Sequence, residues 1–578
     1  MRIRSRMVAI GGLVAVGAVV QLGVDALRAD WALHDAEGRL PALQAAVLAG
    51  DDVRVAVVMR RVQDDAETAD RATNGPLWDL GAHLPWVGRS VAETSTLTHA
   101  VRQVAVGVVP RLIVGARDVR PLVGGSGTQV DLAALRRSSP AFATALDRLQ
   151  PVDDALGRLP EDGVLPPVDA ARQRLVTKVH LLTSGLRQLV AASEVGPAML
   201  GADGPRHYFV GFQNNAESRG TGGLLGAYAI VTADHGHLTV DRLGSDLDLY
   251  GLPPPRRDLG ADYRRLYGHD AWLWQNTNMS GHFPYAAQLW LDMWQQRTGE
   301  HLDGAFATDP VALSYLLDAT GPVPLPGGSA VTAGDVVAQT EQTAYLRYAG
   351  DDLARKDFLV GVASAVLGRL LGPHAPDRSS LVRAVARAAA ERRFMVYSAH
   401  PAEQASLAGT AVAGEVPQSP GPFAFLVVNN TAGNKIDYYL DRSLRYDLGP
   451  CRGGSRESTL TAVLRNDVPA VPLPRFVVGR LDRPGHPVAR GSSSLLVSLY
   501  VSEGAALRSA TLDGRQVAVF AGRERGHPVF VLQVELPRGR PRALALHLVE
   551  PAVRQDPLVL VQSLVRDQST VVRGPACG

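Results

Sequence analysis

One short stretch of the chain gathers side chains that could bind a ligand. Residues 213–223 read Gln-Asn-Asn-Ala-Glu-Ser-Arg-Gly-Thr-Gly-Gly and lie between two apolar runs that predict β-strands. Amides offer paired hydrogen-bond donors and acceptors, the guanidinium of Arg219 matches a carboxylate or a phosphate, and glycines let the backbone approach a ligand. A ligand site is one interpretation, and a structural turn whose amides satisfy one another is the other. The candidate ligand-binding side chains are Gln213, Asn214, Asn215, Glu217 and Thr221.

Carboxylates and further amides follow along the chain. Asp246 and Asp248 stand two apart after a third predicted strand, and oxygen ligands of this kind suit Mg²⁺. These two residues are the candidate metal ligands, and Mg²⁺ is the candidate cofactor, with solvated surface acids as the alternative. Asn276 and Asn278 precede a predicted helix, where a ligand site and a structural turn explain the amides equally well.

Two arginines further along the chain are also candidates. Arg347 and Arg355 lie at the ends of helical patterns, and Arg347 could point back toward residues 213–223. A solvated helix end is the alternative for both. The chain has no HExxH, CxxC, GxSxG or Walker-type phosphate loop, so the sequence does not support a zinc enzyme, a serine hydrolase or a nucleotide hydrolase.

The composition bounds the number of domains and the class of partner. A chain of 578 residues is too long for one hydrophobic core, and a net charge of +2 gives no sign of nucleic-acid binding. Only two cysteines occur, Cys451 and Cys577. They could form a disulfide in an oxidising compartment or stay as separate thiols, because the sequence gives no distance between them.

The N-terminus predicts a membrane anchor. Arg2, Arg4 and Arg6 precede an uncharged run over residues 7–24, and acids follow from Asp25 onward. A helix over that run spans roughly 27 Å, which is close to the thickness of a hydrocarbon core. The positive-inside rule then places the N-terminus in the cytoplasm and the rest outside, with cleavage as a signal peptide as the alternative. No later segment combines sufficient length with freedom from charge, so a single crossing is expected.

The pattern of elements predicts an α+β multidomain fold, with a short cytoplasmic segment and a transmembrane helix over residues 1–26. Residues 27–200 repeat apolar side chains three and four apart, which predicts long helices in a stalk or bundle. Residues 201–400 mix strands and helices, as in a layered α/β domain. Residues 401–422 are rich in Ala, Gly, Ser and Pro and predict a linker or an exposed loop, and short β-rich runs over residues 423–578 predict a β-sandwich.

Several motifs between residues 200 and 450 resemble those of one bacterial family. They are residues 212–217 with Arg219 and 221–223, residues 276–280 with 283–284, residues 303–304, residues 309–313, and residues 434–440. Together they resemble the bacterial domain-of-unknown-function family 4012. The resemblance implies an N-terminally anchored, extracytoplasmic protein of Gram-positive bacteria, and it brings no established activity.

A more distant likeness concerns the order of strands and charged residues. The order strand, Arg-x-Thr, strand, turn, strand, Ser-Asp is similar to the LytR-CpsA-Psr family, which transfers glycopolymers from polyprenyl-phosphate lipids to the cell wall with Mg²⁺. The likeness implies an α/β domain of that kind. Thr221 stands where that family has an Asp, and Ser245 where it has an Arg, so the motif is incomplete. The residues that carry over as catalytic candidates are Arg219, Asp246, Arg347 and Arg355.

Two functions are therefore expected for a chain held in the cell membrane by a single span. The first is a non-catalytic envelope protein that binds glycan, cell-wall polymer or a protein partner, or acts as a scaffold. The second is a Mg²⁺-dependent, phosphotransferase-type ligase that binds or transfers glycopolymers linked to a polyprenyl diphosphate. Convergence of Arg219, Asp246 and Arg347 in one place would favour the enzyme, and separate surroundings would favour the binding protein.

Overall fold

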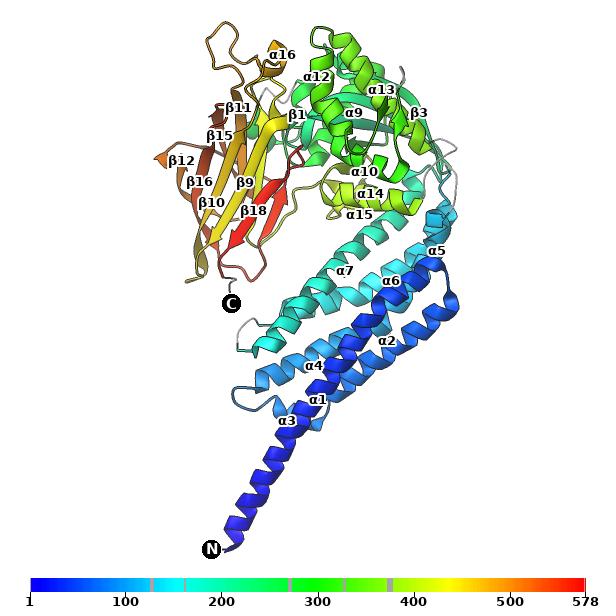
Figure 1. The fold of residues 1–578 in the computed structure, drawn as a ribbon, viewed down its shortest axis with the longest axis vertical. Helices are drawn as coiled ribbons and strands as arrows, with labels where there is room; N and C mark the ends of the chain where they lie inside the picture. The colour runs from blue at the N-terminus through cyan, green and yellow to red at the C-terminus, as the bar shows by residue number, and fades with distance from the viewer. Residues whose placement is uncertain are drawn as a thin grey trace. The chain divides into compact units, whose positions relative to one another are not determined.

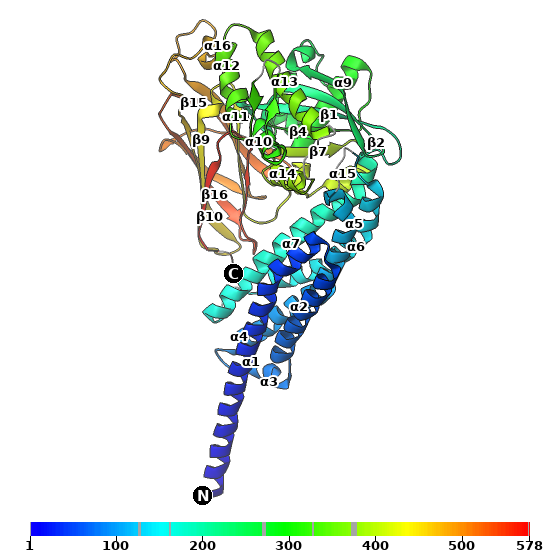
Figure 2. The same ribbon diagram turned by 45° about the vertical axis from the view of Figure 1, so that its right-hand side comes forward.

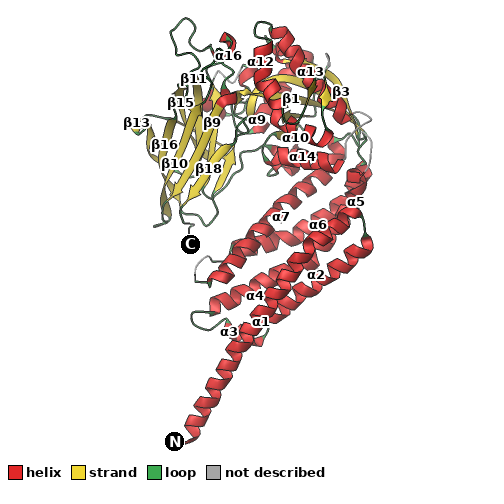
Figure 3. Cartoon of the chain, in the orientation of Figure 1, coloured by secondary structure: helices red, strands yellow, loops and turns green. Residues whose placement is uncertain are grey.

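The chain folds as two compact units. The computed structural model describes residues 2–124, 129–160, 163–268, 273–325, 329–371, 378–575 and 577. The first unit comprises Met1–Leu122 and Asp131–Pro197, and the second comprises Val123–Val130 and Ala198–Cys577. Long helices make up the first unit, whereas sheets and shorter helices make up the second (Figure 3).

The first unit is a bundle of long helices (Figure 1). Its helices are α1 Arg2–Ala49, α2 Asp52–Thr73, α3 Pro76–Gly81, α4 Gly88–Arg102, α5 Val109–Gly124, α6 Leu132–Gly157 and α7 Pro166–Met199, with a π-helical turn at Gln103–Val108. Asp51 and Asp131 cap α2 and α6, because their carboxylates accept hydrogen bonds from the backbone N–H groups of Arg54 (2.9 Å) and Ala134 (3.0 Å). The bundle core includes the buried side chains of Phe142, Leu149, Leu156 and Leu186.

Helix α1 contains the predicted anchor. It runs unbroken from Arg2 to Ala49, so the uncharged run over residues 7–24 and the sequence after it form one helix. The side chains of residues 2–20 lie outside the described residues, and with them most of the predicted anchor.

A different stretch qualifies as a membrane span by length and composition. In the part of the chain that the structure describes, Gly88–Val119 is the one helical stretch that meets both criteria. The expectation that no later segment would meet them was therefore wrong. The stretch carries the buried Glu93, whose Oε1 lies 3.3 Å from Nε of Arg172, and it contributes Leu97 and Val108 to the bundle core. These contacts are those of a helix packed inside the bundle.

The second unit begins with a five-stranded sheet whose strand order is β3-β2-β1-β4-β7. The strands are β1 Arg206–Arg219, β2 Gly222–Asp234, β3 His237–Ser245, β4 Gly304–Thr308 and β7 Phe394–Ser398. β1 and β4 are parallel, and the other neighbours are antiparallel. His235 and Gly236 connect β2 to β3 with φ of 48° and 82°, which is the conformation of a two-residue hairpin turn.

Helices alternate with these strands along the chain, and several of them pack against the sheet. They are α8 Ala261–Tyr267, α9 Phe283–Thr298, α10 Pro310–Thr320, α11 Val336–Ala338, α12 Ala344–Arg347, α13 Asp352–Leu371, α14 Arg378–Ala390 and α15 Pro401–Leu407. Phe209 of β1 stacks on Tyr228 of β2 at 5.5 Å, and Trp290 of α9 packs on Phe209 at 5.6 Å. Residues 401–422 include α15 and bury Leu407 and Val416, so this stretch is an ordered connection rather than an exposed loop.

Two further sheets form a sandwich. Their orders are β13-β12-β16-β10-β9-β18 and β14-β15-β11-β8-β17. The strands are β8 Phe423–Asn430, β9 Leu440–Leu448, β10 Ser455–Asn466, β11 Ser493–Val501, β12 Ala506–Leu512, β13 Arg515–Gln516, β14 Phe520–Glu524, β15 His527–Leu536, β16 Arg542–Pro551, β17 Leu558–Val561 and β18 Gln568–Arg573. Alternate side chains of the two sheets meet in one apolar core that includes Leu426, Leu460, Val497 and Leu546.

The C-terminal strands and a disulfide close the sandwich. β17 and β18 pair in parallel with β8 and β9 at the edges of the two sheets. Cys451 and Cys577 form a disulfide with a Cα–Cα distance of 5.6 Å, which ties the end of the chain to the turn before β10. The expected class, a mixed α+β multidomain chain with N-terminal helices and several sheets, is confirmed.

Candidate functional site

The polar stretch 213–223 continues a strand instead of connecting two strands. β1 extends to Arg219 and β2 begins at Gly222, so only Gly220 and Thr221 connect them. The pairing of β1 with β2 shifts between Phe212 and Gln213 and again before Ser218. The expectation of a polar connection was wrong because the second half of this strand is buried and finds polar partners far away in the sequence.

The amides of this stretch satisfy one another. Oε1 of Gln213 accepts hydrogen bonds from Oγ1 of Thr221 (2.6 Å) and from Nδ2 of Asn278 (3.0 Å). Nδ2 of Asn278 also donates to the carbonyl of Gly223 at 2.8 Å. All three side chains are buried and bond to one another, which is the arrangement of a structural turn, and among the described residues Oδ1 of Asn278 has no hydrogen-bond partner.

The glycines of the stretch allow the backbone to approach other backbone. A Cβ atom at Gly220 would lie 2.2 Å from the carbonyl oxygen of Met279, and one at Gly223 would lie 2.1 Å from that of Asn214. Such distances leave no room for a side chain. These two glycines are therefore needed for packing within the unit and not for contact with a ligand.

The remaining polar groups of the stretch bond to the sandwich, and we call this set of contacts the seam. Nδ2 of Asn215 donates to the carbonyl of Ser563 (3.3 Å), and Oγ of Ser218 donates to Asp437 (2.6 Å). Glu217 forms an ion pair with Lys435. The seam thus fixes the end of β1 to two connections within the sandwich, the one between β8 and β9 and the one between β17 and β18.

Arg219 belongs to the seam. Its guanidinium donates to the carbonyls of Gln275 (3.0 Å) and Asn430 (3.1 Å) and lies 3.4 Å from Glu217. Burial lowers the pKa of Arg219 to about 10, and the charge of Asp437 opposes this shift. With its donors directed at protein groups, Arg219 does not present a free fork to a diphosphate.

The two candidate metal ligands have separate partners. Asp246, in a 3₁₀ turn at Asp246–Leu249, forms a buried ion pair with Lys356 of α13. Burial raises the pKa of Asp246, and the charge of Lys356 opposes the shift. Asp248 accepts a hydrogen bond from the hydroxyl of Tyr228 at 3.2 Å. Within the described ranges, no group of three or more His, Cys, Asp or Glu side chains is placed to hold a metal ion.

The other candidate residues do not join these groups in one site. Arg347 is exposed at the end of α12. Arg355 is buried between the rings of Tyr345 and Phe476, with its Cζ 5.1 Å and 5.0 Å from the ring centres. Asn214 donates to the hydroxyl of Tyr345, and Asn276 ends a 3₁₀ turn at Trp274–Asn276. Arg355 lies near enough to Asp246 for its charge to oppose the rise in the pKa of that carboxyl, whereas Arg219 lies in the seam and Arg347 is exposed. The four predicted catalytic residues therefore do not form one site.

A buried carboxyl that the sequence did not single out lies beside the seam. Oε2 of Glu341 accepts a hydrogen bond from the backbone N–H of Ala216 at 2.6 Å. Burial raises the pKa of Glu341 to about 8, the N–H of Ala216 opposes this shift, and the charge of Asp309 adds to it. Asp309 itself pairs with Arg393 at 2.8 Å. A lone acid four residues before Tyr345 was the only sequence signal for this group.

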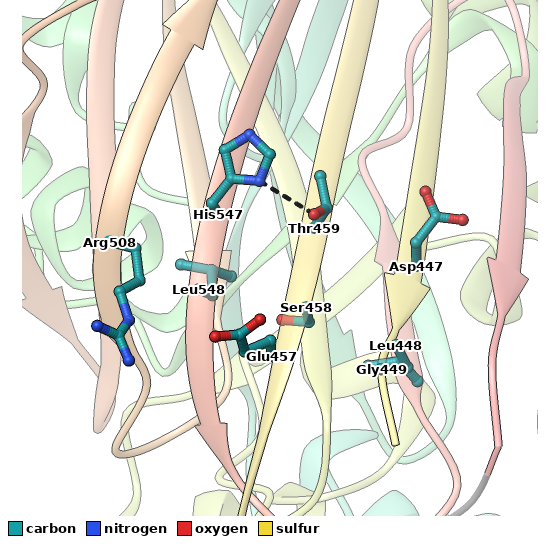
Figure 4. Close-up of a pocket in the computed structure, with 9 residues that line it drawn as sticks. All are labelled: Asp447, Leu448, Gly449, Glu457, Ser458, Thr459, Arg508, His547 and Leu548. Carbon is teal, nitrogen blue, oxygen red and sulfur yellow. Dashed lines mark hydrogen bonds between the residues drawn. The ribbon is translucent and has the colours of Figure 1, made fainter. Parts of the chain in front are cut away.

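A groove lies on the outer face of the larger sheet of the sandwich (Figure 4). It has a volume of about 560 Å³. Its lining residues are Asp447, Leu448, Gly449, Glu457, Ser458, Thr459, Arg508, His547 and Leu548. Asp447, Thr459 and His547 are neighbours across three strands, and Nδ1 of His547 lies 3.2 Å from Oγ1 of Thr459. Because alternate residues of a strand face opposite sides, these polar side chains point away from the apolar core.

Arg508 reaches the groove through a β-bulge. Leu507 pairs with Leu548 and Ser509 pairs with His547, so Arg508 is the extra residue of β12. Figure 4 shows its side chain on the same face as His547 and Glu457. The groove therefore combines a guanidinium, an imidazole, two carboxylates and the hydroxyl of Thr459, a mixture of donors and acceptors that suits a polyhydroxylated ligand. Sequence reasoning missed it because polar side chains at every second position are typical of any solvated sheet face.

Comparison with known proteins identifies one region of the chain. Residues 203–345 match the family model described as "Protein of unknown function (DUF4012)". Neither the comparison with curated proteins nor the comparison with solved structures found a match. The expected likeness to the LytR-CpsA-Psr family is not among these findings. The match to the DUF4012 family is therefore confined to residues 203–345, which contain β1, β2, β3, β4 and the seam residues of β1.

Proposed function

We propose that the chain is a membrane-anchored, extracytoplasmic protein of the cell envelope that binds cell-wall glycan without catalysis. The observation that carries the proposal is the groove on the sandwich. Sugar hydroxyls both donate and accept hydrogen bonds, and the groove offers Arg508 and His547 as donors beside Asp447 and Glu457 as acceptors. The lining residues lie side by side across β9, β10, β16 and β12 on the outer face of the sheet (Figure 4), and such an arrangement suits a segment of an extended polymer.

The proposed location rests on both ends of the chain. The arginines before the uncharged run at residues 7–24 and the acids after it favour a cytoplasmic N-terminus. The run lies within one continuous helix, α1. The Cys451–Cys577 disulfide fits an oxidising compartment outside the cytoplasm, where such bonds persist.

The alternative, Mg²⁺-dependent transfer of glycopolymers from a lipid diphosphate, has less support. It needs Arg219, Asp246 and Arg347 around one diphosphate. Arg219 bonds to carbonyls of the seam, Asp246 pairs with Lys356, and Arg347 is exposed at a helix end. We expect purified full-length protein to bind no diphosphate analogue, with or without Mg²⁺, in isothermal titration calorimetry.

The test of glycan binding uses the full chain in detergent or nanodiscs. When purified cell-wall polysaccharide is sedimented, the wild-type protein should sediment with it. R508A and H547A should each bind the polysaccharide about tenfold more weakly, because each loses hydrogen bonds to the ligand. R523A, on an exposed position of β14 in the other sheet, is the matched control and should bind like the wild type. Equal binding by all four proteins, or none by the wild type, would contradict the proposal.

A further inference from the structure

An exposed apolar surface lies where the bundle meets the proposed anchor. We define the tip as Leu80, Leu84, Trp86 and Val87, whose exposed fractions are 70%, 40%, 92% and 37%. They belong to the end of α3 and the turn that leads to α4. An indole that is 92% exposed is unusual for a protein in water, because aromatic side chains normally gain free energy from burial.

The turn holds Trp86 in a fixed and costly conformation. Trp86 has φ of 68°, a left-handed conformation that a bulky residue rarely adopts and that costs on the order of 1 kcal/mol or more. The backbone N–H of Val87 donates to the carbonyl of Pro85 (3.0 Å), and that of Gly88 donates to the carbonyl of Leu84 (2.9 Å). The turn is therefore closed by its own hydrogen bonds, and it holds the indole outward.

The tip lies at the level of α1 where the uncharged run ends. A Cβ atom at Gly81 would lie 3.0 Å from Cδ1 of Leu22, so α3 packs directly against that residue. Leu22 is two residues before Val24, the last residue of the uncharged run, a rise of roughly 3 Å along the helix. Figures 1 and 2 both show α3 beside α1 at the end of the bundle from which the N-terminal part of α1 projects.

We propose that the tip inserts into the membrane interface and gives the bundle a second, non-spanning contact with the lipid. This inference rests on the proposed anchor. If residues 7–24 cross the hydrocarbon core, Gly81 lies at its edge and the tip lies among the headgroups, where Trp is enriched. The charge of the region agrees, because residues 80–92 contain no acid and include Arg89. A second indole, that of Trp31 on α1, is 76% exposed roughly 10 Å beyond Val24.

A contact at the tip would restrict the tilt of the bundle. A single helix can pivot at the surface of a bilayer, since its tilt is set by neighbouring contacts and interfacial anchors. The tip lies to one side of α1, so its insertion would fix which side of the bundle faces the lipid.

The experiment measures depth in the bilayer at three positions. The full chain is reconstituted in nanodiscs of phosphatidylcholine and phosphatidylglycerol, with the native disulfide intact so that only an introduced thiol takes an environment-sensitive fluorophore. H83C places the probe in the tip and keeps Trp86. V53C places it at a 77% exposed position at the start of α2, roughly 40 Å further along the bundle, and is the matched control. V16C reports on the proposed anchor.

We expect the probe at position 83 to be quenched by a shallow lipid nitroxide and to be at least about threefold less sensitive to aqueous iodide than the probe at position 53. Adding W86S to H83C should bring its iodide quenching toward the value at position 53. Iodide access at 83 equal to that at 53, with position 16 deep in the bilayer, would overturn the inference and leave the anchor standing. Iodide access at position 16 would contradict both the proposed anchor and the proposed contact of the tip with the membrane. Protection at 83 from iodide without quenching by the lipid nitroxide would mean that protein covers the tip, and this too would overturn the inference.

Discussion

The backbone N–H of Ala216 in β1 donates a hydrogen bond of 2.6 Å to the carboxyl of Glu341, and both residues are buried. A buried carboxyl with so few donors around it resists ionisation. The pair lies beside the seam between the sheet and the sandwich, so ionisation of Glu341 would place a buried charge next to the seam.

We expect Glu341 to make the second unit less stable as the pH rises. Because burial raises the pKa of its carboxyl to about 8, the native chain holds this proton more tightly than the unfolded chain does. The contribution to the free energy of unfolding is fully present below the unfolded pKa, near about 4.5, and is lost as the pH approaches about 8. Urea unfolding of the wild type and E341Q across this range should show a difference of a few kcal/mol in pH dependence, with E341Q the flatter. An equal pH dependence of the free energy of unfolding in the wild type and E341Q would show that Glu341 does not cause it.

The effects of substituting Glu217 and Lys435 on the free energy of unfolding should be strongly coupled. Burial lowers the pKa of Lys435 to about 8, and the charge of Asp437 opposes the shift. K435M leaves the carboxylate of Glu217 buried with only Arg219 nearby and should cost roughly 3 kcal/mol. The double variant E217Q/K435M should cost less than the sum of the single variants in chemical denaturation, because neither partner is then left charged and alone. Additive effects would show that the pair is not coupled.

Gly220 should tolerate no side chain. The Cβ of G220A would lie 2.2 Å from the carbonyl oxygen of Met279, and the other close atoms belong to the backbone of Ser280, which cannot move easily. We expect thermal denaturation to show a loss of at least about 2 kcal/mol. G185A is the control, and its effect on stability should have the opposite sign. Gly185 lies in α7, and the added Cβ would have no neighbouring atom within 4 Å among the described residues. The substitution should stabilise the bundle by up to about 1 kcal/mol.

Reduction should destabilise the sandwich. The Cys451–Cys577 disulfide spans 126 residues, and closing a loop of that size in the unfolded chain is worth up to about 5 kcal/mol. Scanning calorimetry should show a lower Tm for the wild type with a reductant than without it. C451S/C577S should melt like the reduced wild type and should not respond to the reductant. A response from that variant would point to another effect of the reductant.

Patterns of neighbouring residues predicted those strands that depend mainly on local sequence. The two apolar runs that flank residues 213–223 lie in β1 and β2, as predicted, because β-branched and aromatic residues favour strands through local packing. The same reasoning failed at residues 213–219, where polar side chains indicated a loop. Their partners, such as Asp437 and Ser563, are more than two hundred residues away in sequence, so no local pattern could reveal them.

The candidate site was harder to predict than the fold. Amides, arginines and glycines are the residues of a ligand site, but they are also the residues that a buried polar network needs, and only burial distinguishes the two. The groove is the opposite case, in which residues typical of an ordinary surface line a candidate site. Its polar side chains alternate along β9, β10 and β16 like those of an ordinary solvated face, and the bulge that brings Arg508 onto that face depends on pairing between β12 and β16.

The seam also determines where this protein can be divided. The region that matches the DUF4012 family ends at residue 345, whereas the partners of Asn215, Ser218 and Glu217 lie at Ser563, Asp437 and Lys435. A fragment that ended with the family region would leave these polar groups without partners, and each would cost about 1–3 kcal/mol if it stayed buried. The region is thus not an autonomous module, and recombination that moved it to another chain would have to carry the sandwich with it.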